Sequence, residues 1–285
     1  MWKSRTYRCM MICSRRRKKR RMRKYNRKSF APQNCPDNLE SMMKYLRLHV
    51  SLQNYKQLLD AAGVENLSHE EFLLRLLSDE CSAKFERQAA NRIARAKFPS
   101  VKTIEEFDFN FPRKIPKQKI LHAAQLSFIE DAGGLVFIGP TGVGKSHLAQ
   151  AIGRKAASRG VRTLFTLAVD MVNHLDAARS DHTLYKAMKV YSSPRLLVID
   201  ELGYLPLDKQ GSDHFFNVIS SRYENGSIIL TANRPFKDWG KTFYDNTVAS
   251  AIIDRLVHHS EVIKIEGASY RIKDRKIKSR TPPQK

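Results

Sequence analysis

The sequence lacks the features that would place the protein in a membrane or in an oxidising compartment. No apolar run approaches the roughly 18 residues needed to cross a bilayer. The positively charged N-terminus is not followed by the apolar segment of a secretory signal. The four cysteines, at positions 9, 13, 35 and 81, include no C-x-x-C pair and have no convincing histidine partners. We therefore expect a soluble protein of the cytoplasm, with free thiols in a reducing compartment and no zinc.

Acidic residues are also scarce in this chain. There are 28 aspartates and glutamates against 51 lysines and arginines, and the formal net charge is +23. Residues 1–41 hold 14 of the basic residues and 2 of the acids. The rest of the chain is therefore basic even without this segment. Such an excess favours a polyanionic partner such as nucleic acid, although positive charge can also serve solubility alone.

A phosphate-binding loop is the clearest motif in the chain. Glycines let the backbone turn tightly so that amide groups converge on phosphate oxygens, and the following helix adds partial positive charge. The lysine supplies charge for the β- and γ-phosphates, and the serine hydroxyl can ligate Mg²⁺. The eight residues that fit G-x-x-x-x-G-K-[ST] are Gly139, Pro140, Thr141, Gly142, Val143, Gly144, Lys145 and Ser146.

An apolar strand that ends in two carboxylates follows further along the chain. Residues 196–199 are all apolar, and Asp200 and Glu201 come directly after them. Asp200 is placed to hold Mg²⁺, directly or through water, while Glu201 can orient and polarise an attacking water molecule. Together with the phosphate loop, this motif predicts a site that hydrolyses ATP rather than one that only holds it.

Strand and helix patterns alternate from about residue 119 onwards. This alternation predicts an α/β fold with a mainly parallel sheet and helices on both faces. The strand between the two motifs suggests that they lie on non-adjacent strands with another inserted, as in the glutamate-bearing ATPases. We expect strands at 135–138, 161–167, 196–200 and 227–231, and helices at 145–158, 169–179, 212–224 and 248–259.

Changes in composition divide the chain into five segments. A capping box formed by Ser68 and Glu71 predicts the start of a long charged helix in the second segment. That segment is compatible both with a small helical bundle and with a module that docks on a partner. The predicted segments are a disordered basic extension or misassigned start at 1–41, a helical module at 42–98, a proline-containing linker at 99–118, an ATPase domain at 119–273 and a basic tail at 274–285.

Five further runs of residues carry a family likeness. They are DELGYLPL at 200–207, ISSRYE at 219–224, TANRPF at 231–236, IDRLVHH at 253–259 and GASYR at 267–271. These runs resemble the IstB family of AAA+ ATPases, the helper proteins of bacterial insertion sequences, which are related to the DnaC and DnaI helicase loaders. The resemblance covers the chain from Met42 to Lys273. It implies an AAA+ P-loop core preceded by a small all-α module. Ala232 stands where the family more often has serine, which leaves Asn233 intact.

The resemblance also implies roles for polar residues outside the two motifs. Asn233 resembles sensor 1, an amide that helps to hold the attacking water, although asparagine before Arg-Pro is also an ordinary turn signal. Arg255 resembles an arginine finger that reaches the γ-phosphate of a neighbouring subunit, with a surface ion pair as the alternative. Arg222 is a second candidate for that finger. Arg271 resembles sensor 2, with an exposed basic tail as the alternative.

Two adjacent histidines, His258 and His259, follow the candidate finger in the sequence. Neighbouring side chains on a helix point about 100° apart and rarely chelate one metal ion together. We therefore interpret this pair as residues at the core edge or at an interface.

The activity implied by the resemblance is that of an ATP- and Mg²⁺-dependent helper protein. Such a protein assembles as a homo-oligomer on double-stranded DNA and recruits a transposase. One alternative is a replicative helicase loader whose helical module docks on the helicase. Another is a non-catalytic DNA scaffold with a vestigial nucleotide site, although the intact set of predicted site residues argues against it.

Overall fold

The computed structural model describes residues 36–270 of the chain. The chain forms two compact units, and the boundary between them in the sequence lies between Ala83 and Lys84. Within the described part, no helix has the length and apolar character needed to span a bilayer. Most of the basic extension predicted at 1–41 lies outside the described residues, as do Arg271 and the tail at 274–285.

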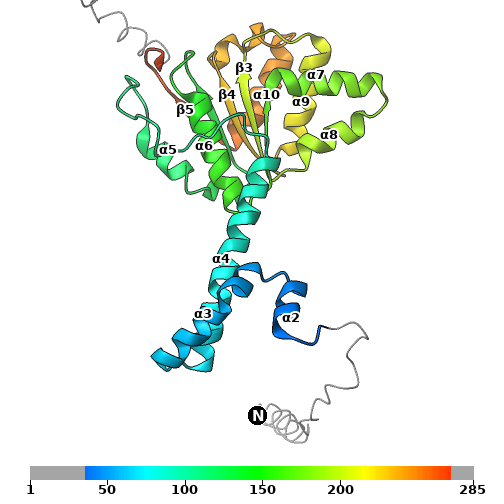
Figure 1. The fold of residues 1–285 in the computed structure, drawn as a ribbon. Coiled ribbons are helices and arrows are strands. Elements are labelled where there is room, and N and C mark those ends of the chain that lie inside the picture. The colour runs from blue at the N-terminus through cyan, green and yellow to red at the C-terminus, as the bar shows by residue number, and fades with distance from the viewer. Residues whose placement is uncertain (1–35, 271–285) are drawn as a thin grey trace, which may run out of the picture. The chain divides into compact units, whose positions relative to one another are not determined.

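The first unit is helical, as predicted, and its capping box is confirmed. The backbone amide of Ser68 donates to Glu71 Oε2 at 2.9 Å, and the amide of Glu71 donates to Ser68 Oγ at 3.2 Å. Glu80 is almost fully buried and accepts hydrogen bonds from the amides of Val50 and Ser51, which joins two helices. The helices are α2 (Leu39–Tyr45), α3 (His49–Glu65) and α4 (His69–Arg95), the last of which continues beyond Ala83 (Figure 1).

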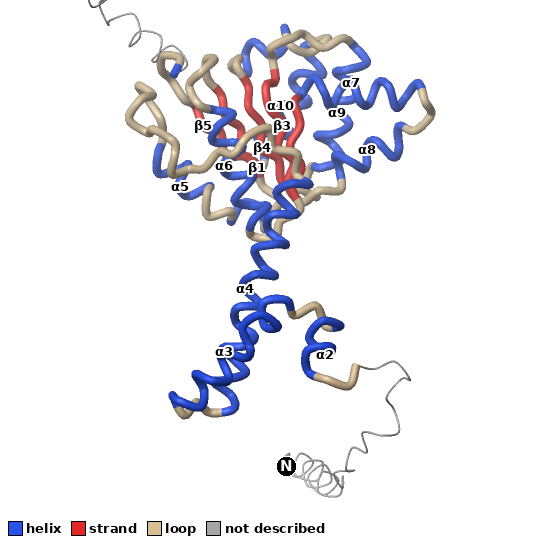
Figure 2. The backbone as a smooth tube through the Cα atoms, viewed as in Figure 1, coloured by secondary structure: helices blue, strands red, loops and turns tan. Residues whose placement is uncertain are grey.

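The second unit contains a five-stranded sheet in which every pair of neighbouring strands is parallel (Figure 2). The order β2-β3-β4-β1-β5 confirms that the strand before the phosphate loop and the acidic strand are not adjacent. The inserted strand is β4, rather than the strand that separates the motifs in sequence. The strands are β1 (Gly134–Ile138), β2 (Thr163–Leu167), β3 (Leu196–Leu202), β4 (Ser227–Ala232) and β5 (Ser260–Lys264).

Helices cover both faces of the sheet, as predicted. Because successive strand residues point to opposite faces, Leu135 and Phe137 of β1 pack with α5 and α6, while Val136 and Ile138 pack with the other helices. Sequence patterns missed α5, α8 and β5, which are short. The helices are α5 (Lys117–Ala123) and α6 (Lys145–Ser158) on one face, and α7 (Ala168–Ser180), α8 (Leu184–Ser192), α9 (Lys209–Arg222) and α10 (Asn246–His258) on the other.

The segment predicted as a linker belongs to this second unit. Ile104 is buried, and Phe107, Phe109 and Ile115 contact the same apolar cluster as α6. The backbone of Lys114 exchanges two hydrogen bonds of 3.0 Å with Glu266, beyond the last strand. The prolines agree with a chain that forms little regular structure, but these four apolar side chains are buried in the core or pack against it.

Candidate nucleotide site

The phosphate loop connects β1 to α6, which is the strand-loop-helix context that the motif requires. Gly142 and Gly144 have φ angles of 83° and 96°, a backbone conformation that favours glycine. A Cβ atom at Gly144 would also lie 2.4 Å from the ring of Phe107. Lys145 begins α6, and its ammonium group donates to the carbonyl of Pro140 at 2.8 Å. The predicted loop residues thus form one compact turn at the N-terminus of α6, where helix polarity favours phosphate.

The two predicted Mg²⁺ ligands lie next to each other although they are far apart in sequence. Ser146 Oγ donates a hydrogen bond to Asp200 Oδ1 at 2.9 Å. Asp200 is only 3% exposed and sits in β3, beside the phosphate loop. A carboxylate and a hydroxyl at the end of a phosphate loop are the oxygen ligands that suit Mg²⁺ beside nucleotide phosphates. This donor set fits the predicted ion.

Glu201 and Asn233 reach the same site from two neighbouring strands. Glu201 has a φ angle of 65°, which an L-residue rarely adopts and which often marks functional positions. Asn233 follows β4, and its buried Oδ1 has no hydrogen-bond partner in the part of the chain that the structure describes. An orphaned amide oxygen of this kind fits a group that orients a water molecule or a ligand. The structure therefore brings together two of the three predicted catalytic residues, Glu201 and Asn233.

Glu201, Asn233 and residues 142–146 of the phosphate loop line a cavity of about 570 Å³. Its size is typical of a small-molecule or cofactor site. Besides the loop, Glu201 and Asn233, its walls include residues 100–102, 106–108 and 111–112 of the predicted linker, together with Tyr270. That residues of the predicted linker line the cavity was not predicted from the sequence. The available signal was the group of aromatic residues Phe107, Phe109 and Phe111 within a polar, proline-containing stretch.

Arg255 lies outside this cavity, at the end of the sheet where the strands begin. It borders a small hollow together with Gly134 and Ser260, the first residues of β1 and β5, and its guanidinium lies 4.5 Å from the centre of the Phe216 ring. The phosphate loop follows the other end of β1. A five-residue strand spans about 16 Å, so Arg255 does not face the phosphate loop of its own chain. This position excludes the reading of Arg255 as a residue of its own subunit's site.

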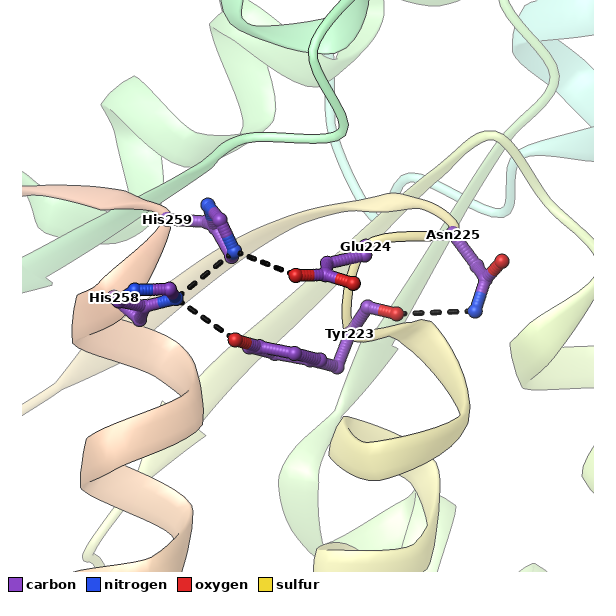
Figure 3. A network of polar contacts seen from close by, with 5 residues as sticks. All are labelled: Tyr223, Glu224, Asn225, His258 and His259. Carbon is purple, nitrogen blue, oxygen red and sulfur yellow. Dashed lines mark hydrogen bonds and ion pairs between the residues drawn. The ribbon is translucent and has the colours of Figure 1, made fainter.

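The two histidines after Arg255 belong to a surface network of polar contacts (Figure 3). His258 Nδ1 lies 2.8 Å from the hydroxyl of Tyr223 and 3.0 Å from His259 Nε2, which is 3.3 Å from Glu224 Oε1. The side chains of both histidines are exposed. They therefore do not pack in the core, and the predicted role at an interface stays a prediction.

Arg222, the second candidate for the arginine finger, is excluded by its burial. Its side chain is 1% exposed, and burial lowers its pKa to about 10, so it stays protonated at neutral pH. Its guanidinium donates to carbonyl oxygens within its own chain and cannot reach a neighbouring subunit. The acceptors are the carbonyls of Tyr191, Ser192, Pro194, Arg195 and Ser227, at 2.7 to 3.3 Å.

The sheet order, the loop after β1, the carboxylates on β3 and the asparagine after β4 define a P-loop ATP-binding domain of the AAA+ class. Sequence comparison makes the assignment specific. The family described as IstB-like ATP binding protein matches residues 41–278, and the chain belongs to this family.

Relatives of known origin are similar over most of the chain. An ATP-binding protein of insertion sequence IS5376 from Geobacillus stearothermophilus is 39% identical over 81% of this chain and 92% of its own length. The corresponding protein of insertion sequence IS21 from Pseudomonas aeruginosa is 38% identical over 84% of this chain and 90% of its own length. Both are named as putative ATP-binding proteins of insertion sequences.

Solved structures share the fold at lower identity. DnaI superposes with a TM-score of 0.51 at 21% identity, over 57% of this chain and 90% of that one. The replication initiator DnaA, bound to AMPPCP and single-stranded DNA, gives a TM-score of 0.50 at 23% identity, over 62% of this chain and 54% of that one. At these identities the likeness concerns the fold alone.

Proposed function

We propose that the protein is an Mg²⁺-dependent ATPase that assembles on double-stranded DNA and recruits or stimulates a transposase. The observation that carries the ATPase proposal is the group formed by Lys145, Ser146, Glu201 and Asn233 around one cavity, with Asp200 hydrogen-bonded to Ser146. This group contains the phosphate-binding lysine, the Mg²⁺ ligands, a general base or water-orienting carboxylate and a polarising amide that hydrolysis requires. A site that only holds nucleotide needs neither Glu201 nor Asn233.

The residues would divide the work according to their chemistry. Amides of the phosphate loop and the Lys145 ammonium would hold the phosphates, while Ser146 and Asp200 would hold Mg²⁺, which neutralises developing charge when bound. Glu201 would accept a proton from water or orient it, with Asn233 beside it. The aromatic residues of the segment 100–112 give the cavity an apolar wall suited to a nucleotide base.

Assembly into a homo-oligomer is supported by the position of Arg255. It lies at the strand-start edge, away from its own phosphate loop, and is therefore available to complete the site of a second copy. An arginine supplied by a neighbour stabilises transition-state charge and is worth 10³–10⁵ in rate for related phosphoryl transfers.

The DNA and transposase partners are supported by charge and by the relatives. The formal net charge of +23 suits a polyanion, and the relatives at 38% and 39% identity belong to insertion sequences. The alternative is a helicase loader, and the likeness to DnaI, which concerns the fold alone, does not decide between the two roles. An integrase-like reading frame beside the gene would support the transposition role, whereas primosome genes would support loading.

Steady-state ATP hydrolysis, measured against protein concentration with and without duplex DNA, tests the proposal. We expect the rate per subunit to rise with concentration and with DNA, because sites shared between subunits form only on assembly. A rate that stays flat and indifferent to DNA would contradict assembly on DNA.

The variant Lys145→Ala should lose nucleotide binding. The ammonium group is the charge nearest to the expected phosphates, so we expect ATP affinity to fall by at least about 100-fold. Fluorescence titration with a labelled ATP analogue measures this. Lys155→Ala, at the other end of α6, serves as the control. Unchanged affinity in the Lys145 variant would remove this lysine from the site.

Mixing two inactive variants tests whether Arg255 acts across subunits. Arg255→Ala keeps its own nucleotide loop, and Lys145→Ala keeps its own arginine, so mixed assemblies should recover part of the hydrolysis that each variant has lost. The measurement is ATPase activity of the mixture, with crosslinking to show that mixed assemblies form. If such assemblies form without any recovery, Arg255 has no role in the neighbour's site.

A further inference from the structure

The pairing of β3 with β4 is irregular at the candidate site, where β3 has one residue more than β4. Ile199 pairs with Leu230 and Leu202 pairs with Ala232, so two residues of β3, Asp200 and Glu201, lie opposite a single residue of β4. That single residue is Thr231. Bulges of this kind re-aim side chains and are common beside active sites. Here the two residues in the bulge are the carboxylates on which the proposed hydrolysis depends.

The Thr231 hydroxyl makes contact with both residues of the bulge. It donates a hydrogen bond to Asp200 Oδ1 and accepts one from the backbone amide of Glu201 at 3.0 Å. Asp200 Oδ1 also accepts from Ser146 Oγ. Thr231 is 1% exposed, so water has little access to replace its hydroxyl in these contacts. One hydroxyl therefore links the ion-binding carboxylate, the backbone of the catalytic carboxylate and, through Asp200, the phosphate-loop serine.

We infer that Thr231 is a positioning residue that sets the geometry of Asp200 and Glu201 for Mg²⁺ binding and hydrolysis. This inference rests on the proposed ATPase function. Shape alone does not explain why position 231 holds threonine, because valine has nearly the same shape and suits a buried strand equally well. Unlike valine, threonine carries a hydroxyl that can donate to the carboxylate and accept from the amide at the same time. Thr231 would act through Asp200, which would hold Mg²⁺, and through Glu201, which would orient the attacking water.

The test compares Thr231→Val, which removes the hydroxyl, with Thr231→Ser, which keeps it. The matched control is Thr163→Val, a buried strand threonine at the start of β2 whose hydroxyl donates to the carbonyl of Val161. Two quantities are measured on the full chain: the ATPase rate, and the factor by which Mg²⁺ strengthens ATP binding relative to EDTA.

For Thr231→Val we expect kcat to fall at least about tenfold and the Mg²⁺ factor to fall about tenfold, as for other changes behind a metal ligand. ATP affinity in EDTA should stay within about threefold of wild type, because the phosphate loop is intact. Thr231→Ser should recover most of both quantities, and Thr163→Val should match wild type. A purely structural role would lower stability without changing the Mg²⁺ factor.

Two results would overturn the inference: a valine variant with wild-type turnover and Mg²⁺ factor, or a serine variant as impaired as valine. If the valine variant does not fold, Thr231→Ser and Thr231→Ala provide the same comparison, because they differ only in the hydroxyl. Equal behaviour of that pair would also overturn it. Absence of hydrolysis in wild type would instead contradict the proposed function, and the Mg²⁺ factor would still decide the role of Thr231.

Discussion

Glu201→Gln protein should bind ATP with an affinity within a few fold of wild type, yet hydrolyse it at least about 100-fold more slowly. Glutamine has the shape of glutamate but cannot accept a proton at neutral pH. The left-handed backbone at Glu201 and the hydrogen bond from its backbone amide to the Thr231 hydroxyl do not depend on the carboxylate, so the bulge should persist in the variant. Because ATP would be held without turnover, assemblies on DNA should accumulate.

Single-turnover hydrolysis and equilibrium binding of a labelled ATP analogue separate the two effects. Glu70→Gln, an exposed change in the first turn of α4, is the matched control and should behave as wild type. Full turnover in the Glu201 variant would contradict its role as base or water-orienting group. Loss of ATP binding would show instead that the carboxylate supports the phosphate site itself.

Local sequence patterns predicted those parts of the fold and of the site that are formed by residues close together in sequence. The phosphate loop, the apolar strand before Asp200 and the capping box of Ser68 and Glu71 each depend on a few residues close in sequence. Parallel strands then bring the loop and the acidic strand to one edge of the sheet. For this reason the proximity of Ser146 and Asp200 could be expected from the sequence.

Parts of the site that depend on contacts between distant segments could not be predicted. The segment around Phe107 looks like a linker because its prolines interrupt regular structure, yet its rings pack on the phosphate loop and on α6. The proposed role of Thr231 depends on a β-bulge in the neighbouring strand, where two residues lie opposite Thr231. No periodicity of the sequence indicates such a bulge. Arg222 and Arg255 are both arginines in helices, and the sequence does not show that Arg222 is buried and bonded to carbonyls while Arg255 is only half-buried.

The buried guanidinium of Arg222 joins three segments at the strand-start edge of the sheet. Its acceptors lie at the end of α8, in the turn that leads into β3, and at the first residue of β4. In a region with little access to water, these carbonyls have few other donors. Replacing the arginine leaves them unsatisfied, and each unsatisfied buried group costs about 1–3 kcal/mol. This arrangement predicts that Arg222 contributes to the stability of the fold.

Arg222→Met, which keeps much of the side-chain volume, should therefore lower the free energy of unfolding by about 3–5 kcal/mol. Urea denaturation followed by circular dichroism measures the change, and Arg179→Met, an exposed change in α7, should stay within about 0.5 kcal/mol of wild type. An arginine finger would give the opposite pattern, with normal stability and lost hydrolysis. A loss below about 1 kcal/mol would mean that water or a backbone shift satisfies the carbonyls after the arginine is removed. The expected pattern assigns Arg222 to the fold and leaves Arg255 as the arginine available to a neighbouring site.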